Sequence, residues 1–454
     1  MRYQRKWKDH QREDGSALIA VLVVTMILFV LITSIMMGFL IQSRLIERDH
    51  DRIQARYSAE AGIYQFLADT THSISPLMDS LKITLKDSSH VHIWTKTFGG
   101  YLRVTSMARD HHQSATVEAL VGEDTIPAFN KAIVLGDIQS ALTVAGTSII
   151  DGDILVGFRG IKKSEFKGEP FKGEVNGEIK IDSTHPLPSF NNRFFKYEIS
   201  CDNSFITNPP NDVLVTDENQ LDLTIHMPFK TRQIWYHKGD LTLTSNSPVR
   251  LPESLIIVTT GNLVIRGDIQ CGIYDRCISG KNLVLVDSVS GEHALLYARD
   301  SLVVENDVHL SGQLIAIKRI RIRNGAYLAY PSVVYLNGYT RQNMHKGTII
   351  VAGSSRVNGT VILPKADSLI TRDSTKITIG KDAIVRGAVY NSGKTELDGK
   401  VYGSVLTFQF YMYRSPTTYI NWLLNATIDR RKRPDQYVLP MGFNQKKRYR
   451  VLAW

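Results

Sequence analysis

The feature that most constrains this chain is a run from Ser16 to Ile41 that contains no charged side chain. Leu, Ile, Val, Met and Phe dominate the run. At about 1.5 Å per residue, a helix of this length exceeds the roughly 30 Å hydrocarbon core of a bilayer. The sequence therefore predicts one membrane-spanning helix, with some tilt.

A secretory signal peptide is the first alternative for this run. Such a signal has an apolar region of about 7–15 residues followed by a cleavage site of small residues. The run here is longer, and the residues after it, such as Arg44 and Glu47, are charged. The segment before it is basic and short, so we expect that segment in the cytoplasm and the bulk of the chain on the other side of the membrane.

The helical pattern continues beyond the apolar run. Arg44, Arg48, Arg52 and Arg56 form an i, i+4 column that ends at Glu60. Proline is absent until position 76. The sequence predicts one continuous helix of about fifty residues, half of it in lipid. Apolar residues recur near helical spacing at Ile46, Ile53, Tyr57, Ala61 and Tyr64.

The leader, the Gly15–Ser16 pair, the long apolar helix and the stretch ARYSAEAGIYQFL at 55–67 resemble type IV pilin-like proteins. The resemblance is to minor pilins and pseudopilins of the PilX/GspK kind. It implies that a prepilin peptidase cuts between Gly15 and Ser16 on the cytoplasmic side. Major pilins carry glutamate at the fifth mature position, where this chain has Ala20. This departure fits an initiating or tip-type minor subunit.

The same resemblance implies the partners of the N-terminal region. They are membrane lipid, the prepilin peptidase and other pilin-like subunits of a bacterial inner membrane. Small side chains permit close helix packing in lipid; the candidates are Ala17, Ala20, Ser34 and Gly38. Residues 90–122 read as strand, turn, strand, turn and strand, which predicts a small antiparallel sheet beside the helix.

A repeat of about twenty residues dominates the rest of the chain. It appears as GDLTL, GNLVI, KNLVL, DSLVV and KRIRI, with spacings of 22, 20, 19 and 18 between the central residues. Such a period predicts a parallel β-helix, or β-solenoid, similar in texture to bactofilin-like proteins. A β-sandwich is the competing fold. The central residues are Leu241, Leu263, Leu283, Leu302 and Ile320.

The repeat pattern leaves an interruption near 158–235, which we expect to be a long loop or an inserted subdomain. The stretch after residue 410 breaks the strand pattern, and Tyr419–Leu424 is expected to form a helix over the last coil. The predicted segments are a leader (1–15), a transmembrane helix (16–41), a pilin-like helix and sheet (42–125), a solenoid (131–410) and a cap with a basic tail (411–454).

The chain contains three cysteines, too few for a disulfide framework. Cys271 and Cys277 lie close together in CGIYDRC, which allows either a local bridge in an oxidising compartment or two free thiols. The net charge is +10, and residues 429–454 supply six of these charges. Because this excess lies in a tail and not on a folded face, we do not expect a nucleic-acid partner.

Signatures of chemistry are sparse. The chain has no G-x-x-x-x-G-K-[ST], G-x-S-x-G or H-E-x-x-H motif. We expect no cofactor, no metal and no enzymatic activity. Candidates considered and set aside are the histidines His90, His92, His111 and His112, the DGD of Asp151–Asp153, and the coil aspartates Asp268, Asp287, Asp300 and Asp307.

The sequence thus favours a mainly β protein with an N-terminal membrane helix. Its expected role is structural: a pilin-like protein of a bacterial envelope that presents a solenoid as an adhesive, spacer or tip module. One alternative is an anchored scaffold that is never processed. Another is a β-helix that binds or processes a surface glycan.

Overall fold

The computed structural model describes residues 7–68, 80–85, 90–110, 113–182, 187–225, 233–337, 347–364, 375–443 and 448–453. The chain divides into two compact units. The N-terminal unit comprises residues 1–66, 80–94 and 105–118, and the solenoid unit comprises the remainder. Strands β2 (His90–Phe98), β3 (Tyr101–Asp110) and β4 (Gln113–Glu123) contribute residues to both.

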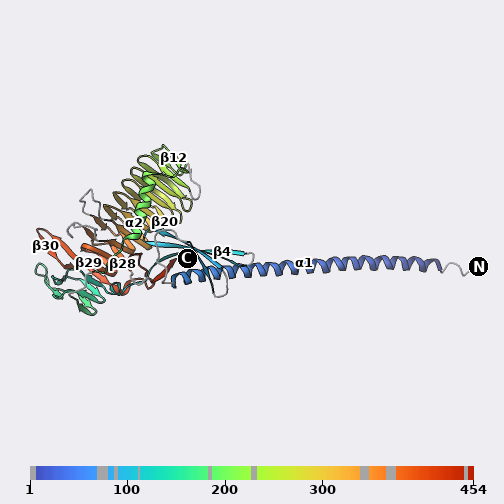
Figure 1. Cartoon of the computed structure of the whole chain (residues 1–454), viewed down its shortest axis with the longest axis horizontal. Helices are drawn as coiled ribbons and strands as arrows, with labels where there is room; N and C mark the ends of the chain where they lie inside the picture. Colours follow the sequence, from blue (N-terminus) through green and yellow to red (C-terminus); the bar gives the residue numbers. More distant parts are fainter. Residues whose placement is uncertain are drawn as a thin grey trace, which may run out of the picture. The chain divides into compact units, whose positions relative to one another are not determined.

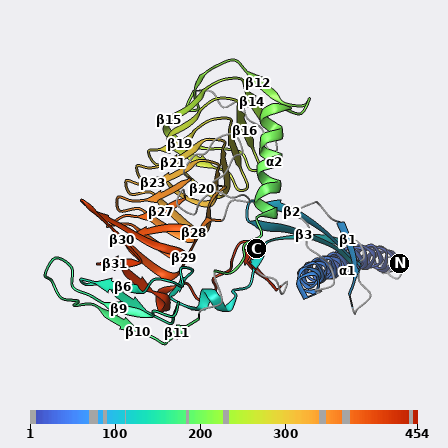
Figure 2. The same ribbon diagram turned by 60° about the vertical axis from the view of Figure 1, so that its left-hand side comes forward.

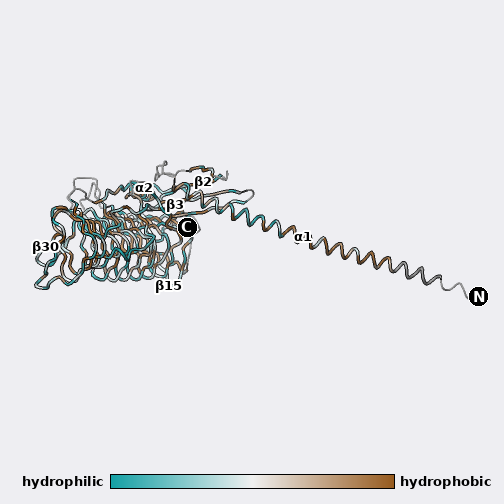
Figure 3. Tube along the Cα trace, turned by 90° about the horizontal axis from the view of Figure 1, so that it is seen from below, coloured by the Kyte–Doolittle hydropathy of each residue, from teal (hydrophilic) through white to brown (hydrophobic). Residues whose placement is uncertain are grey.

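Helix α1 (Trp7–Ala68) is a single helix of 62 residues, which confirms the predicted continuity (Figure 1). The segment 17–41 of this helix is apolar, and the segment that follows it is more polar (Figure 3). Of the described residues, one helical segment, Ala17–Ala68, is long and apolar enough to cross a membrane. This is compatible with a single-pass anchor.

Within the N-terminal unit, the last turns of α1 pack against a small sheet. β1 (Ser80–Thr84) pairs antiparallel with β2. The helix buries Ala55, Ala59 and Ile63, whereas Ile53 and Tyr57 of the predicted stripe are exposed. The two alanines on the buried face let the strands approach the helix closely.

The solenoid unit is a three-sided parallel β-helix, as predicted (Figure 2). Its first face comprises β12 (Leu214–Thr216), β14 (Ile234–His237), β16 (Ile256–Thr259), β18 (Arg276–Ser279), parts of β20 (Ser290–Ala298), β22 (His309–Ala316), β24 (Tyr327–Leu336), β26 (Arg356–Leu363), β28 (Ile384–Leu397) and β29 (Lys400–Arg414), then β5 (Ile133–Leu135), β8 (Ile154–Val156) and β11 (Ile179–Ile181).

The second face comprises β13 (Gln220–Asp222), β15 (Leu241–Arg250), β17 (Leu263–Cys271), β19 (Leu283–Val286), β21 (Ser301–Val304), β23 (Arg319–Ile322), β25 (Thr348–Val351) and β27 (Lys376–Ile379), followed by parts of β28 and β29. A separate sheet contains β31 (Trp422–Leu424), β6 (Leu142–Ala145) and β9 (Ile161–Lys163). The third face joins the other halves of the long strands to β32 (Thr427–Asp429), β7 (Ile149–Asp151) and β10 (Glu174–Asn176).

The central residues of the sequence repeat lie opposite one another on neighbouring strands of the second face. Leu241 pairs with Leu263, Leu263 with Leu283, Leu283 with Leu302, and Leu302 with Ile320. All five side chains are buried. Each coil therefore adds one aliphatic side chain to a continuous inner ladder, since alternate residues of a strand point to the same side.

The chain does not wind the solenoid in one pass. Residues 133–181 stack on β29 and β32, and the chain then restarts at the other end with β12 and winds back. Five short strands, β9 to β13, lie inside the predicted interruption, so the solenoid extends further than expected. Strands such as Glu174–Asn176 are too short and polar for periodicity to reveal.

Helix α2 (Arg193–Thr207) lies in the true interruption and runs along the stacked coils (Figure 2). It covers the first face: Phe195 and Ile199 share a buried cluster with Ile278 and Tyr335. The rings of Phe195 and Tyr335 stack with centroids 3.8 Å apart. On the coils that α2 covers, this face is consequently buried on both sides.

The C-terminal segment differs from the expected helical cap. Residues 417–429 form β30 (Thr417–Ile420), β31 and β32, and no helix covers Tyr419–Leu424. Asn421 and Asn425 adopt positive φ and turn the chain between these strands, a conformation that Asn tolerates. β33 (Tyr449–Ala453) pairs antiparallel with β4.

Candidate functional site

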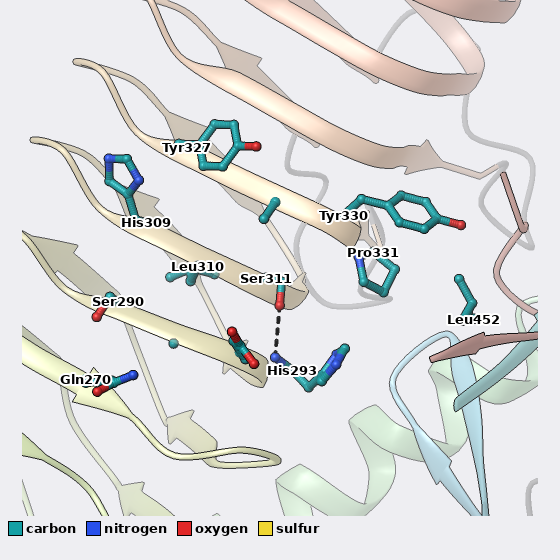
Figure 4. Close-up of a pocket in the computed structure, with 13 residues that line it drawn as sticks. Gln270, Ser290, His293, His309, Leu310, Ser311, Tyr327, Tyr330, Pro331 and Leu452 are labelled. Atoms are coloured by element: carbon teal, nitrogen blue, oxygen red, sulfur yellow. Dashed lines mark hydrogen bonds between the residues drawn. The ribbon is translucent and has the colours of Figure 1, made fainter. Parts of the chain in front are cut away.

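An open groove of about 510 Å³ crosses four coils of the solenoid on its third face (Figure 4). Gln270, Ser290, His309 and Tyr327 occupy matching positions on β17, β20, β22 and β24. Their side chains point outward, because they alternate with inward residues such as Leu310. One column of polar and aromatic side chains therefore lines the groove.

Corners of unequal length shape the end of the groove. Glu292 and His293 form a two-residue corner in β20, whereas β24 inserts Tyr330 and Pro331 at the same place. The mismatch interrupts the ladder on each coil, as β-bulges do. The backbone N–H of His293 donates to the Ser311 hydroxyl at 3.0 Å, which ties two of these corners together. The complete lining is Gln270, Ser290, Gly291, Glu292, His293, His309, Leu310, Ser311, Tyr327, Ala329, Tyr330, Pro331 and Leu452.

Aromatic rings dominate the chemistry of the groove. The rings of His309 and Tyr327 lie 5.5 Å apart, and His293 stacks on Tyr274 with centroids 5.8 Å apart. Burial lowers the pKa of His293, which favours the neutral imidazole, and raises the pKa of Tyr330 to about 12. Among its described lining residues, Glu292 is the one carboxylate and there is no Lys or Arg.

The groove also holds a polar atom without a partner. Nδ1 of His293 is buried and has no hydrogen-bond partner among the described residues. In contrast, the hydroxyl of Tyr327 accepts a hydrogen bond from Asn358 at 2.9 Å, which fixes its ring. A buried imidazole nitrogen that lacks a partner costs free energy.

A second polar cluster joins α2 to β18. Nη1 of Arg276 lies 2.9 Å from Glu198 and 2.8 Å from Asp202, and both carboxylates are buried. Burial raises the pKa of Asp202 to about 7, against the lowering effect of Arg276. The burial of Lys96 and the nearby positive charge of Arg276 both lower the pKa of Lys96. Because Arg276 pairs with both carboxylates of α2 in an enclosed position, this cluster helps to dock α2 on the solenoid.

The residues predicted for processing and packing lie in the first half of α1. Gly15 and Ser16 are helical. Ala17, Ala20, Ser34 and Gly38 are exposed, and a Cβ added at position 38 would meet no atom within 4 Å. Their roles in cleavage and helix packing stay predictions.

Cys271 and Cys277 are both buried and are free thiols. The Cys277 thiol interacts with Cys271, and this contact together with burial raises its pKa well above the usual value. The structure thus brings the two sulfurs together, and their bridging stays a prediction.

The side chains considered for metal binding or catalysis do not converge. His90 lies 3.2 Å from the Thr84 hydroxyl, and His92 stacks on Trp94. His111 and His112 lie outside the described residues. In the described part of the chain, no group of three or more His, Cys, Asp or Glu is arranged to hold a metal ion. Asp151 pairs with Arg431 at 3.0 Å.

Of the coil aspartates, Asp287, Asp300 and Asp307 occupy corners, whereas Asp268 lies within β17. Asp287 and Asp307 adopt positive φ, and Asp287 and Asp300 pair with Arg266 and Lys318. The groove was not predicted from the sequence, where its signal was the aromatic and polar residues at outward positions of neighbouring coils.

Comparisons with known proteins add little. No protein-family model matches the chain, and no curated protein matches it. Among solved structures, the chain is similar to the competence-associated pilin ComZ from Thermus thermophilus. The identity is 10%, the alignment covers 89% of this chain and 97% of that chain, and the TM-score is 0.22.

Proposed function

We propose that this chain is a membrane-anchored, pilin-like structural protein of a bacterial envelope that presents its solenoid outside the cytoplasmic membrane. The observation that carries the proposal is the division of α1. In one unbroken helix, the segment 17–41 is apolar and exposed, whereas the last turns bury Ala55, Ala59 and Ile63 against a sheet. A helix built in this way is held in lipid at one end and carries a folded module at the other.

The role of the solenoid is proposed as an adhesive, spacer or tip module. A stack of coils with a continuous aliphatic core is stiff and elongated, which suits presentation away from a surface. The chain acts as a structural component and not as an enzyme. Its partners are lipid, a prepilin peptidase and other pilin-like subunits, which pack against the small residues of α1.

The mature N-terminus tests this proposal. We expect the intact mass of the membrane-purified protein to correspond to a start at Ser16. A Gly15→Leu variant should retain its first fifteen residues, because the peptidase of the resembled family requires glycine before the cut. Gly38→Leu is the matched control, since it changes a glycine of the same helix and should be processed normally. A wild-type protein that begins at Met1 would contradict processing and favour an anchored scaffold.

A further inference from the structure

We infer that the groove on the third face of the solenoid binds a neutral oligosaccharide. The inference rests on the proposed function only for placing the groove outside the cytoplasmic membrane. Binding itself requires neither cleavage at Gly15 nor assembly with other subunits. The two tests therefore fail independently.

The charge of the groove selects the class of ligand. A polyanion needs Lys or Arg along its path, and the described lining residues include neither, although Arg250 and Arg356 follow in register beyond the two ends of the column. Glu292 is exposed at the rim, where its carboxylate can accept hydrogen bonds from hydroxyl groups. Gln270 and Ser290 add neutral donors and acceptors. These groups match a ligand rich in hydroxyls and without charge.

The aromatic side chains supply flat surfaces for the apolar faces of sugar rings. His309 is exposed and Tyr327 is half-buried, and their rings lie on neighbouring coils (Figure 4). Asn358 holds the Tyr327 hydroxyl, so the ring is placed before any ligand arrives. A side chain that is already ordered loses little entropy on binding.

The spacing of the coils suits a linear chain. Neighbouring strands lie about 4.8 Å apart, so the column from Gln270 to Tyr327 spans about 14 Å. The spacing between neighbouring strands is close to the length of one sugar ring, so the column accommodates a short oligosaccharide. Tyr330, Pro331 and Leu452 line the same groove beside His293.

Isothermal titration calorimetry on the full-length protein tests the inference. The detergent should be lauryldimethylamine oxide, because detergents with sugar head groups would compete for the groove. The probes are cellohexaose, maltohexaose and hexa-N-acetylchitohexaose, with a hexamer of galacturonic acid as the charged comparator. We expect at least one neutral probe to bind and the charged probe to bind more weakly.

Variants locate the binding. Tyr327→Ala and His309→Ala should each weaken binding by roughly tenfold, the value of one lost aromatic contact. Tyr327→Phe keeps the ring and should keep most of the affinity. Tyr413→Ala is the matched control, since Tyr413 is an exposed aromatic residue of β29 outside the groove. Thermal midpoints equal to wild type show that the variants are folded.

Three results would overturn the inference. The first is that no neutral probe binds, and the second is that the galacturonic acid hexamer binds more tightly than all of them. The third is binding that Tyr327→Ala and His309→Ala leave unchanged in folded protein.

Discussion

Arg276 of β18 donates a hydrogen bond to Asp202 of α2 at 2.8 Å, and this contact joins residues 74 positions apart in the chain. Glu198, one turn earlier in α2, shares the same guanidinium nitrogen. One cation thus faces two buried carboxylates, and one oxygen of each carboxylate has no hydrogen-bond partner among the described residues. Among the described residues, a single arginine therefore balances the two carboxylates that α2 buries against the solenoid.

Removing this arginine should weaken the solenoid unit. We expect Arg276→Met to lower the free energy of unfolding by about 3–5 kcal/mol, because two carboxylates stay buried without a cation. Urea unfolding measures the loss, and trypsin cleavage after Arg193 or Lys196 should report the release of α2. Arg266→Met is the matched control. Arg266 is exposed and pairs with Asp287 at 3.4 Å, so its loss should cost no more than about 1 kcal/mol. Equal effects of the two variants would contradict the special role of Arg276.

Asp202 should make stability depend on pH. Its pKa is about 7 in the folded protein and about 3.9 in an unfolded chain. Because the folded pKa is the higher one, the stabilisation is present below pH 4 and is lost as the pH rises through 7. The loss amounts to at most about 4 kcal/mol. Asp202→Asn should remove this dependence.

The measurement compares urea unfolding of wild type and Asp202→Asn at pH 5 and pH 8. The variant should gain stability relative to wild type at pH 8. If the free energies of unfolding of wild type and Asp202→Asn differ by the same amount at both pH values, Asp202 is already ionised at pH 5. The contact with Arg276 favours this ionised form.

The three cysteines should differ in reactivity. Only the thiolate reacts with iodoacetamide, and burial together with the neighbouring Cys271 raises the pKa of Cys277. Cys201 is half-buried. In folded protein at pH 8 we expect slow modification of Cys201 alone, and in denatured, unreduced protein modification of all three. Intact mass counts the additions. If denatured protein takes up one label until a reductant is added, Cys271 and Cys277 form a disulfide.

Local patterns explain what could be predicted from the sequence. The inner ladder from Leu241 to Ile320 was recognisable, because each coil repeats the same short apolar alternation and a solenoid stacks equivalent residues. The long helix was recognisable from its apolar run and from the absence of proline.

Contacts between distant segments explain why other features could not be predicted from the sequence. Nothing near Arg276 indicates that Asp202 will reach it, because α2 lies outside the repeat. The stacking of residues 133–181 on the last coils depends on the whole path of the chain. The groove arises from corners of unequal length at His293 and Pro331. A periodic sequence pattern does not predict such insertions between repeats.

The face of α1 that packs against the sheet was also not predicted correctly from the sequence. A substitution at Gly62 tests the packing that the structure shows. A Cβ at position 62 would lie 2.6 Å from Cγ1 of Val91, a buried and β-branched residue with little freedom to move. Gly62→Leu should therefore destabilise the packing of α1 on β2 in the N-terminal unit by about 1–3 kcal/mol, although Gly is the poorer helix former. Ala61→Leu is the matched control, since Ala61 is exposed.

Amide hydrogen exchange of the full-length protein measures the effect. In Gly62→Leu, exchange should become faster in residues 55–66 of α1 and in residues 90–94 of β2. In Ala61→Leu, both segments should exchange as in wild type. Unchanged protection in Gly62→Leu would mean that the helix does not press its small residues against Val91. Faster exchange in both variants would indicate that the opposite face of α1, which includes Tyr57 and Tyr64, is the one that packs.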